Sequence, residues 1–510
     1  MAVLLVSFAA FAHGAALLEN KRPVSVEDLI AIRRPSQPSL SPDGRTVAFV
    51  LSSPALATNT YSHDLYIVSA DGAGSPRLLA KGADITGNLV SFQRQSPVWS
   101  PDSERLVFVA PDASGSEIRS VRVDTAKVDV LVSSKSLGPD VEFKPVMFGT
   151  SLAYSPDGRW LAFLASRKSP EAPHESPMHA IEAHEDWVPA QRQFRPRIYQ
   201  LYLLEMRTGR VSAMTGDGVS VASFDWSPDS TQLALSIETD PNVSSSYMTT
   251  DLHVLDAATG ALRTLVTQPG MDEHPRWSPD GKLIAFSSQR GQEDWTYATT
   301  LGVVAADGSA PARYVRQVLD TIGGSIVPVR WSLDGNSVDV RTFHDLSRHI
   351  FRVKISEGTV SRLTPRRDRH YSDFSYSQDG RRLAFVAEGT VVPPDIHVAD
   401  ANASEMQPLR LTECNPQWSQ LQVPTLQRVM WRSSDGRWDL NGLLLKPSTA
   451  AAQPLPLLTH IEGGAEHGSA GTQRWLPLSA AGVGRAGIRD FHSEHAGACG
   501  VWNGLHARHS

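Results

Sequence analysis

The chain has 510 residues, with 48 lysine and arginine residues against 54 aspartate and glutamate residues and a formal net charge of −6. This balance gives no electrostatic reason to expect binding to nucleic acid or to an anionic membrane surface. The two cysteines, Cys414 and Cys499, are too few for a disulfide framework or a zinc site of four cysteines. The length leaves room for more than one domain.

The N-terminus carries an apolar run from Val3 to Ala12 that ends in small residues. The run is too short to span a bilayer, and no lysine or arginine precedes it. We predict that residues 1–20 are a signal or leader segment and that the protein is periplasmic or secreted, with a cytoplasmic location as the alternative. No other stretch is typical of a transmembrane helix. A short helix is predicted from Val24 to Arg33, with Ser25 as its N-cap.

A turn motif of the Ser-Pro-Asp-Gly type then recurs seven times along the chain. In the copy at Ser278 the proline fixes φ, the aspartate caps the turn, and Gly281 takes the positive φ. The serines of the seven copies are Ser41, Ser100, Ser155, Ser227, Ser278, Ser332 and Ser377. Their spacing fits a blade of four strands with loops of variable length, because such a unit must stack on its neighbours to bury its faces. The fold class is therefore predicted as all-β, with a seven-bladed β-propeller of TolB-like or WD40-like repeats over residues 21–425.

The sixth copy departs from the pattern. Asp339 stands where the other copies have an apolar residue in the strand after the turn. Two interpretations remain open: a local irregularity with a functional meaning, or a repeat that has degraded at random.

The longest gap between copies contains a segment from Pro170 to Arg197 that is rich in proline, histidine and charge. We predict an extended surface loop. Its side chains include metal-ligand types, but no recognised zinc spacing is present. A metal site and a site for a substrate amine are weaker alternatives, so no metal and no cofactor is predicted. The residues concerned are His174, Glu175, His179, Glu182, His184, Glu185 and Asp186.

The character of the sequence changes after residue 425. A predicted hairpin runs from Trp431 to Pro447 without the propeller turn motif, and a buried strand follows from Pro456 to Ile461. The strand leads directly into Gly463 and Gly464.

These features together resemble the prolyl oligopeptidase family of serine peptidases, especially its acylaminoacyl-peptidase-like bacterial members. The resemblance covers residues 22–479, and its specific part runs from Trp431 to Gly464, because TolB-like scaffold proteins share the propeller repeats. It implies a propeller that filters access to an α/β-hydrolase domain with a Ser, Asp and His triad. On this basis residues 426–479 are interpreted as the start of that domain.

The family's nucleophile would stand in a Gly-x-Ser-x-Gly turn, and the chain contains no such motif. No catalytic residue is therefore assigned. Gly463 and Gly464 match the family's glycine-rich loop, whose backbone N–H groups can approach an oxyanion. They depart from its usual His-Gly-Gly-Pro, since Glu462 precedes them and Ala465 follows. His460 and His467 are weak alternatives as bases.

Residues 480–510 are rich in glycine, alanine, histidine and arginine and show no useful periodicity. We predict an unstructured tail and hypothesise a shifted reading frame from about Leu478. A zinc site is the weaker alternative there. It would use His492, His495 and Cys499, with His506 and His509.

The predicted function is that of the propeller portion of a serine peptidase. Its partners would be peptides in the parent enzyme, and the chain itself is expected to be inactive because the nucleophile is missing. Whether to class it as an enzyme stays open. The alternative is a non-catalytic, TolB-like periplasmic propeller that binds a peptide or protein partner. Truncation is expected to expose apolar surface near Leu457.

Overall fold

The structure is a computed structural model. It describes residues 21–82, 96–112, 115–143, 150–168, 197–216, 218–238, 250–292, 299–315, 318, 321–322, 325–344, 347–365, 369–403, 405–437, 439–448, 457–462 and 489–494. The predicted leader, residues 1–20, lies outside this part of the chain. No helix among the described residues is long and apolar enough to cross a bilayer.

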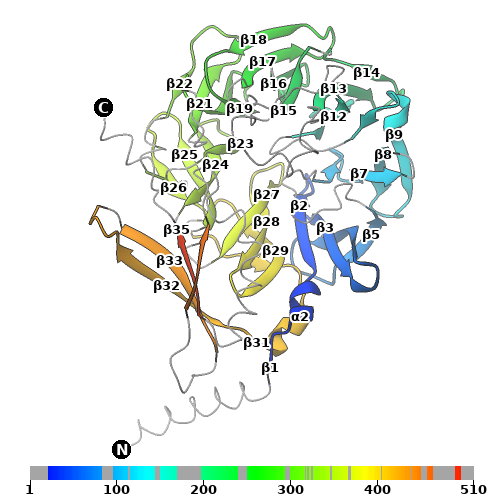
Figure 1. The fold of residues 1–510 in the computed structure, drawn as a ribbon. Helices are drawn as coiled ribbons and strands as arrows, with labels where there is room; N and C mark the ends of the chain where they lie inside the picture. The colour runs from blue at the N-terminus through cyan, green and yellow to red at the C-terminus, as the bar shows by residue number, and fades with distance from the viewer. Residues whose placement is uncertain are drawn as a thin grey trace, which may run out of the picture.

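Seven sheets surround a common axis, as predicted (Figure 1). Blade 1 contains β2 (Arg34–Leu40), β3 (Thr46–Ala55), β4 (Thr60–Ser69) and β5 (Arg77–Lys81). Blade 2 contains β6 (Val98–Trp99), β7 (Arg105–Asp112), β8 (Gly115–Arg122) and β9 (Val128–Ser133). Blade 3 contains β10 (Val141–Glu142), β11 (Leu152–Tyr154), β12 (Trp160–Lys168), β13 (Arg197–Glu205) and β14 (Val211–Ala213). Short 3-10 helices, Leu56–Thr58 and Ser134–Ser136, lie in blade 1 and after β9.

The remaining four blades repeat this plan. Blade 4 contains β15 (Ser220–Trp226), β16 (Gln232–Glu238), β17 (Thr250–Asp256) and β18 (Leu262–Val266). Blade 5 contains β19 (Asp272–Trp277), β20 (Leu283–Ser288), β21 (Thr300–Ala305) and β22 (Arg313–Tyr314). Blade 6 contains β23 (Val327–Trp331), β24 (Ser337–His344), β25 (Ser347–Lys354) and β26 (Val360–Arg362). Blade 7 contains β27 (His370–Tyr376), β28 (Arg382–Gly389), β29 (Val392–Asp400) and β30 (Leu409–Arg410).

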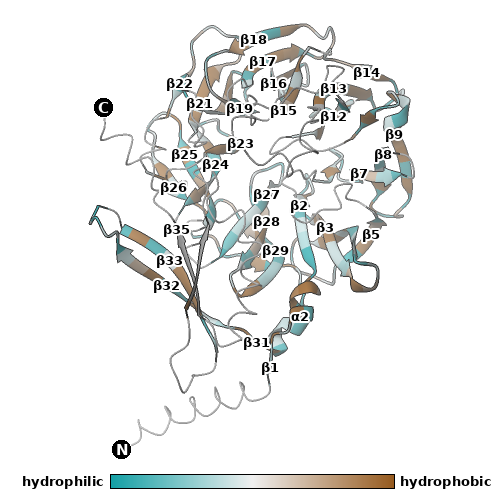
Figure 2. Cartoon of the chain, viewed as in Figure 1, coloured by the Kyte–Doolittle hydropathy of each residue, from teal (hydrophilic) through white to brown (hydrophobic). Residues whose placement is uncertain are grey.

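Within each blade the strands pair antiparallel. The first strand lies nearest the axis and the fourth at the rim (Figure 1). Apolar side chains from adjacent blades pack between the sheets, as in the cluster that joins Val338 and Val340 of blade 6 to Leu301 and Val303 of blade 5. The axial strands are more polar, and Figure 2 draws β2 and β27 largely in teal and white. The core therefore lies between blades, and polar residues gather at the axis.

The seven predicted turns link the first strand of each blade to the second. In every copy the serine Oγ donates to the aspartate Oδ1 at 2.5–2.7 Å. The same Oγ accepts the N–H five residues later at 2.9–3.0 Å. Gly281 has a φ of +71°, as predicted, and in two copies Ser103 and Ser230 take the same left-handed region at +63°. The serine and aspartate side chains of the motif therefore both stabilise the turn.

Tryptophans tie several neighbouring blades together. The indole Nε1 of Trp99 donates to the Ser39 carbonyl of the preceding blade at 2.8 Å, and that of Trp331 to the Arg276 carbonyl at 2.9 Å. Trp277 differs, because its buried Nε1 has no partner in the described part of the chain. There the backbone N–H of Trp277 donates to Asp225 Oδ2 at 2.8 Å instead.

The ring closes between blades 1 and 7 without any exchange of strands, because each blade uses only consecutive strands. Across this seam the Leu40 N–H donates to Ser375 Oγ at 2.9 Å, and Arg382 Nη1 donates to the Gly44 carbonyl at 3.0 Å. Asn415 Oδ1 accepts a hydrogen bond from the Arg33 N–H at 2.9 Å, and Asn415 Nδ2 donates to the Arg33 carbonyl at 2.8 Å. Apolar residues of the two blades share one core cluster.

The chain enters and leaves the propeller on the same side. Strand β1 (Arg22–Pro23) pairs in parallel with β31 (Leu421–Gln422), which follows a 3-10 helix at Pro416–Gln420. The helix α2 spans Val26–Ile30, and Ser25 caps it as predicted, in a capping box with Asp28. The helix is shorter than the prediction of Val24 to Arg33.

The last described sheet has the order β32-β33-β35-β34. Its strands are β32 (Thr425–Arg432), β33 (Asp439–Lys446), β34 (Leu457–Glu462) and β35 (Arg489–Glu494). The pair β34 and β35 is parallel, which requires a crossover connection and is typical of α/β folds. Figure 1 shows this sheet to one side of the propeller.

Two predictions about this region are corrected. The tail from residue 480 was predicted to lack regular structure, but β35 lies within it. The β32–β33 hairpin was predicted to lack the propeller turn, yet Ser433 Oγ donates to Asp435 Oδ1 at 2.5 Å and Gly436 has a φ of +68°. The Ser-Ser-Asp-Gly turn therefore has the same hydrogen bond and the same left-handed glycine as the propeller turns, although it lacks the proline.

Candidate functional site

The predicted hydrolase residues fall where side chains are not described. Gly463, Gly464 and His467 lie outside the described residues. His460 lies in β34 and His492 in β35, where only the backbone is described. The oxyanion-loop prediction therefore stays a prediction.

The same holds for the predicted metal-ligand types of the long loop, residues 169–196, and for His495, Cys499, His506 and His509 of the tail. In the part of the chain that the structure describes, no group of three histidine, cysteine, aspartate or glutamate residues is placed to hold a metal ion.

Asp339, the residue that breaks the repeat pattern, has a structural role. It is 2% exposed and accepts two hydrogen bonds from Arg352, from Nε at 2.7 Å and from Nη2 at 2.9 Å. The hydroxyl of Tyr376, in the next blade, donates to Asp339 Oδ2 at 2.8 Å. Asp339 thus forms a buried ion pair with Arg352 of the same blade. Its hydrogen bond with Tyr376 joins blade 6 to blade 7.

A set of polar residues meets at the propeller axis, and we call it the axial cluster: Gln37, His274, Arg276, Arg341 and Asp373. Gln37, His274 and Asp373 occupy equivalent bulges in the first strands of blades 1, 5 and 7. All three have a left-handed φ, of 54°, 57° and 54°. A bulge bends its strand and redirects a side chain, and a left-handed φ costs energy in a residue other than glycine.

Two contacts of the axial cluster cross between blades, one from Gln37 to Asp373 and one from Arg276 to Val329. The Gln37 N–H donates to Asp373 Oδ2 at 3.2 Å. Arg276 donates from Nη1 to the Pro275 carbonyl at 2.8 Å and from Nε to the Val329 carbonyl at 3.3 Å. Burial and the charges of Arg341 and Arg276 hold the pKa of His274 well below its usual value, so this ring is neutral at neutral pH. Burial also lowers the pKa of Arg341, and the Asp373 carboxylate opposes this shift.

Two carboxyl groups lie beside the axial cluster, at the start of β19. Burial raises the pKa of Asp272 to about 7, although hydrogen bonds from Ser288 and Gln268 oppose the shift. Burial, followed by the charge of Glu238, raises the pKa of Glu273 to about 8. Glu273 Oε2 lies 3.5 Å from His274 Nε2, so a protonated acid and a neutral imidazole face each other near pH 7.

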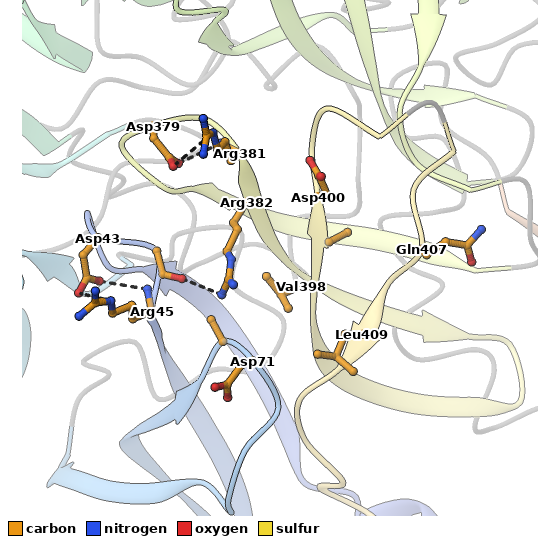
Figure 3. Close-up of a pocket in the computed structure, with 13 residues that line it drawn as sticks. Asp43, Arg45, Asp71, Asp379, Arg381, Arg382, Val398, Asp400, Gln407 and Leu409 are labelled. Atoms are coloured by element: carbon orange, nitrogen blue, oxygen red, sulfur yellow. Dashed lines mark hydrogen bonds and ion pairs between the residues drawn. The ribbon is translucent and has the colours of Figure 1, made fainter.

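A separate pocket of about 620 Å³ opens in the seam between blades 1 and 7 (Figure 3). Its lining includes the apolar Val398 and Leu409 together with charged side chains of both blades. Arg382 reaches across the seam to the Gly44 carbonyl, and Asp43 accepts hydrogen bonds from within its own turn (Figure 3). Arg382 thus stabilises the seam and Asp43 stabilises its own turn.

We compared the chain with known proteins. No family model matches the chain. Dipeptidyl-peptidase 5 of Porphyromonas gingivalis is 21% identical over 488 residues, which cover 86% of this chain and 63% of that protein. The chain therefore spans less than two thirds of the length of this curated relative.

Solved structures show the same fold. An uncomplexed acylaminoacyl peptidase of Pyrococcus horikoshii matches with a TM-score of 0.66 and 14% identity, over 94% of this chain and 68% of that one. A structure from a study of two prolyl endopeptidases matches with a TM-score of 0.58 and 13% identity, over 96% and 64%. The chain therefore shares its fold with solved peptidases named acylaminoacyl peptidase and prolyl endopeptidase, and it is similar in sequence to a dipeptidyl-peptidase.

A propeller domain that was solved alone also has this fold. The propeller domain of the trilobed protease from Pyrococcus furiosus matches with a TM-score of 0.51 and 14% identity, over 75% of this chain and 97% of that domain. That domain is described as having an open velcro topology. The ring of consecutive strands described above agrees with that description.

The resemblance to the prolyl oligopeptidase family could be read from the sequence, but the axial cluster could not. Its members come from different blades, and no motif links them. One signal was present: Asp339 and Arg341 alternate with the apolar Val338 and Val340 in β24, which indicates that one face of this strand is polar.

Proposed function

We propose that the chain is the propeller portion of a longer parent protein, a serine peptidase of the prolyl oligopeptidase family. That parent would hydrolyse peptides. The alignment with dipeptidyl-peptidase 5 over 86% of this chain carries the proposal. The mixed sheet after the propeller supports it, because the parallel pair β34 and β35 is what the start of an α/β domain requires.

The chain as printed is proposed to be catalytically inactive. A serine peptidase of this class needs a serine on a Gly-x-Ser-x-Gly turn with a histidine base within hydrogen-bond reach. The 510 residues contain no such turn. The propeller's role in the parent is to admit unfolded peptides and to exclude folded proteins from the catalytic domain.

The test is hydrolysis of a chromogenic acyl-peptide by the purified chain, combined with labelling by a serine-directed fluorophosphonate. We expect neither turnover nor labelling. An active member of the family from another source serves as the positive control. Turnover that co-purifies with a single labelled serine of this chain would refute the proposed inactivity.

A second function has one observation in its favour. The propeller closes through its own contacts between blades 1 and 7, so it can exist as a binding module without a further domain. In that case it would bind a peptide or protein partner without catalysis, in the periplasm or outside the cell. A pull-down from periplasmic extract that recovers one stoichiometric partner would favour this function over the first.

A further inference from the structure

The pocket in the seam between blades 1 and 7, which we call the seam pocket, has the size of a ligand site. Its volume of about 620 Å³ lies within the range of about 300–1,000 Å³ that is typical of small-molecule sites. Its lining comes from turns and strand ends of both blades, between Asp43 and Asp71 in blade 1 and between Asp379 and Leu409 in blade 7. A molecule bound there would therefore contact the two blades at once.

The seam pocket lies at the end of β2 that is remote from the chain entry. β2 begins at Arg34, next to the contact between Arg33 and Asn415, and ends at Leu40, just before the turn that lines the pocket. The pocket is therefore at the opposite end of the seam from the point where the chain enters the propeller.

An apolar surface bridges the seam inside the pocket. Leu409 of blade 7 is 45% exposed, and a Cβ atom added at Gly72 of blade 1 would lie 3.3 Å from its Cδ2. Val398 is the partner of Leu409 in the register of β29 and β30. A hydrocarbon stem can cover such a surface while its charged end stays in contact with water. The surface therefore fits a ligand with an aliphatic stem.

The charged side chains of the lining leave an excess of negative charge, because four aspartates face three arginines. Two of the arginines lie 3.9–4.0 Å from an aspartate of their own turn, in the pairs Arg45–Asp43 and Arg381–Asp379. The third, Arg382, donates to a backbone carbonyl across the seam. One carboxylate charge is left over, so the pocket favours a cation over an anion.

The other two aspartates, Asp71 and Asp400, stand on opposite sides of the seam, with Val398 and Leu409 between them (Figure 3). Each uses Oδ1 to accept hydrogen bonds from within its own turn, at 2.6–2.8 Å. These bonds hold the pKa of Asp71 below its usual value, so this carboxylate is charged at neutral pH. Among the described residues, Oδ2 of either aspartate takes part in no hydrogen bond or ion pair. Each carboxylate therefore offers one oxygen to a ligand.

We propose that the seam pocket binds an alkylammonium group, the chemistry shared by a lysine side chain and a free diamine. The stem would lie on Val398 and Leu409, and the ammonium would donate to Oδ2 of Asp71 or Asp400. An ammonium suits this site better than a guanidinium, because a guanidinium prefers two oxygens of one carboxylate and here only one is open. The inference goes beyond the proposed function and does not depend on it.

The test uses the full 510-residue chain and three probes: N-acetyl-lysine N-methylamide, its uncharged norleucine analogue, and cadaverine. Ligand-observed NMR titrations measure the dissociation constants, since a single side chain binds weakly. An ion pair at a part-exposed site changes affinity by up to about fivefold. We therefore expect the lysine probe to bind about fivefold more tightly than the norleucine probe at low ionic strength.

The double variant Asp71→Asn with Asp400→Asn should reduce this preference to less than about twofold. It removes both charges but keeps an oxygen acceptor for each turn. The matched control is Asp307→Asn with Asp256→Asn, which should keep the preference. Asp307 follows β21 as Asp71 follows β4, and Asp256 ends β17 as Asp400 ends β29. Like Asp71 and Asp400, each accepts the N–H two residues later.

Circular dichroism checks that both double variants fold. If the pocket variant does not fold, added sodium chloride should weaken the preference of the unmodified chain, because salt screens an exposed ion pair. A preference that is insensitive to salt would overturn the inference.

Equal binding of the lysine and norleucine probes to the unmodified chain overturns the inference, and so does a preference that survives in the pocket variant. Binding of the lysine probe that depends on Asp71 and Asp400 supports a lysine side chain as the ligand. Binding of cadaverine alone, with the same dependence, supports a free diamine. None of these outcomes changes the proposed function, whose test is hydrolysis.

Discussion

At the scale of single residues, Asp339 is buried with all its hydrogen bonds supplied by Arg352 and Tyr376. Replacing one partner of a buried ion pair leaves the other charge uncompensated. We predict that Asp339→Ala lowers the free energy of unfolding by about 3 kcal/mol in urea titrations. The control is Glu357→Ala, which breaks an exposed pair with Lys354 and should cost less than about 0.5 kcal/mol. Equal effects of the two variants would show that Asp339 is not the tie between blades 6 and 7.

The raised pKa of Glu273 predicts how the stability of the fold depends on pH. Its pKa is raised to about 8 in the folded chain, whereas an unfolded glutamate titrates near about 4.3. Between these values the folded state holds a proton that the unfolded state has released. This contribution to stability is therefore complete below about pH 4 and is lost as the pH rises through about 8, at up to about 1.4 kcal/mol per pH unit.

Glutamine mimics the protonated acid, so Glu273→Gln should be close to the unmodified chain in stability at pH 5 and more stable than it at pH 9. Urea titrations at the two pH values measure the difference, with the exposed Glu357→Gln as the control. A difference that stays constant between pH 5 and pH 9 would contradict the burial of a protonated Glu273.

At the scale of structural elements, the seam between blades 1 and 7 depends on a few side chains. Asn415 satisfies both backbone groups of Arg33, so Asn415→Ala should leave two part-buried groups without this partner and cost about 1 kcal/mol locally. Hydrogen exchange should then speed up in β2 and β27 and stay unchanged in β15 and β16 of blade 4. Uniform acceleration across all blades would show that the ring opens as one unit instead of at the seam.

The elements themselves were predictable where local chemistry decides them. The turn at Ser278 and Gly281 carries its own proline, aspartate and glycine, so its conformation follows from four residues. The hydrogen bond from Tyr376 to Asp339 was not predictable, because Tyr376 lies in the next blade and meets Asp339 only when blades 6 and 7 pack together. The strand β35 was missed because its pairing with β33 and β34, and not its own periodicity, defines it.

At the scale of the whole molecule, the sheet that follows the propeller exposes large apolar side chains. Met430 is 69% exposed and Leu457 is 57% exposed. Apolar surface of this kind normally marks an interface, so we predict that the purified chain self-associates or aggregates at micromolar concentration. Gel filtration with light scattering measures this, and Met430→Glu should reduce the association. A sharp monomeric profile of the unmodified chain would contradict the prediction.

The central proposal is that the parent of this propeller is a serine peptidase of the prolyl oligopeptidase type. The most direct measurement is resequencing of the source DNA from the codon for Pro454 onward, with translation in all three frames. We predict that another frame continues from near Leu478 into a Gly-x-Ser-x-Gly motif, with an aspartate and a histidine further along. A confirmed frame with nothing hydrolase-like in any of the three would contradict the claim and leave a propeller that acts by binding alone.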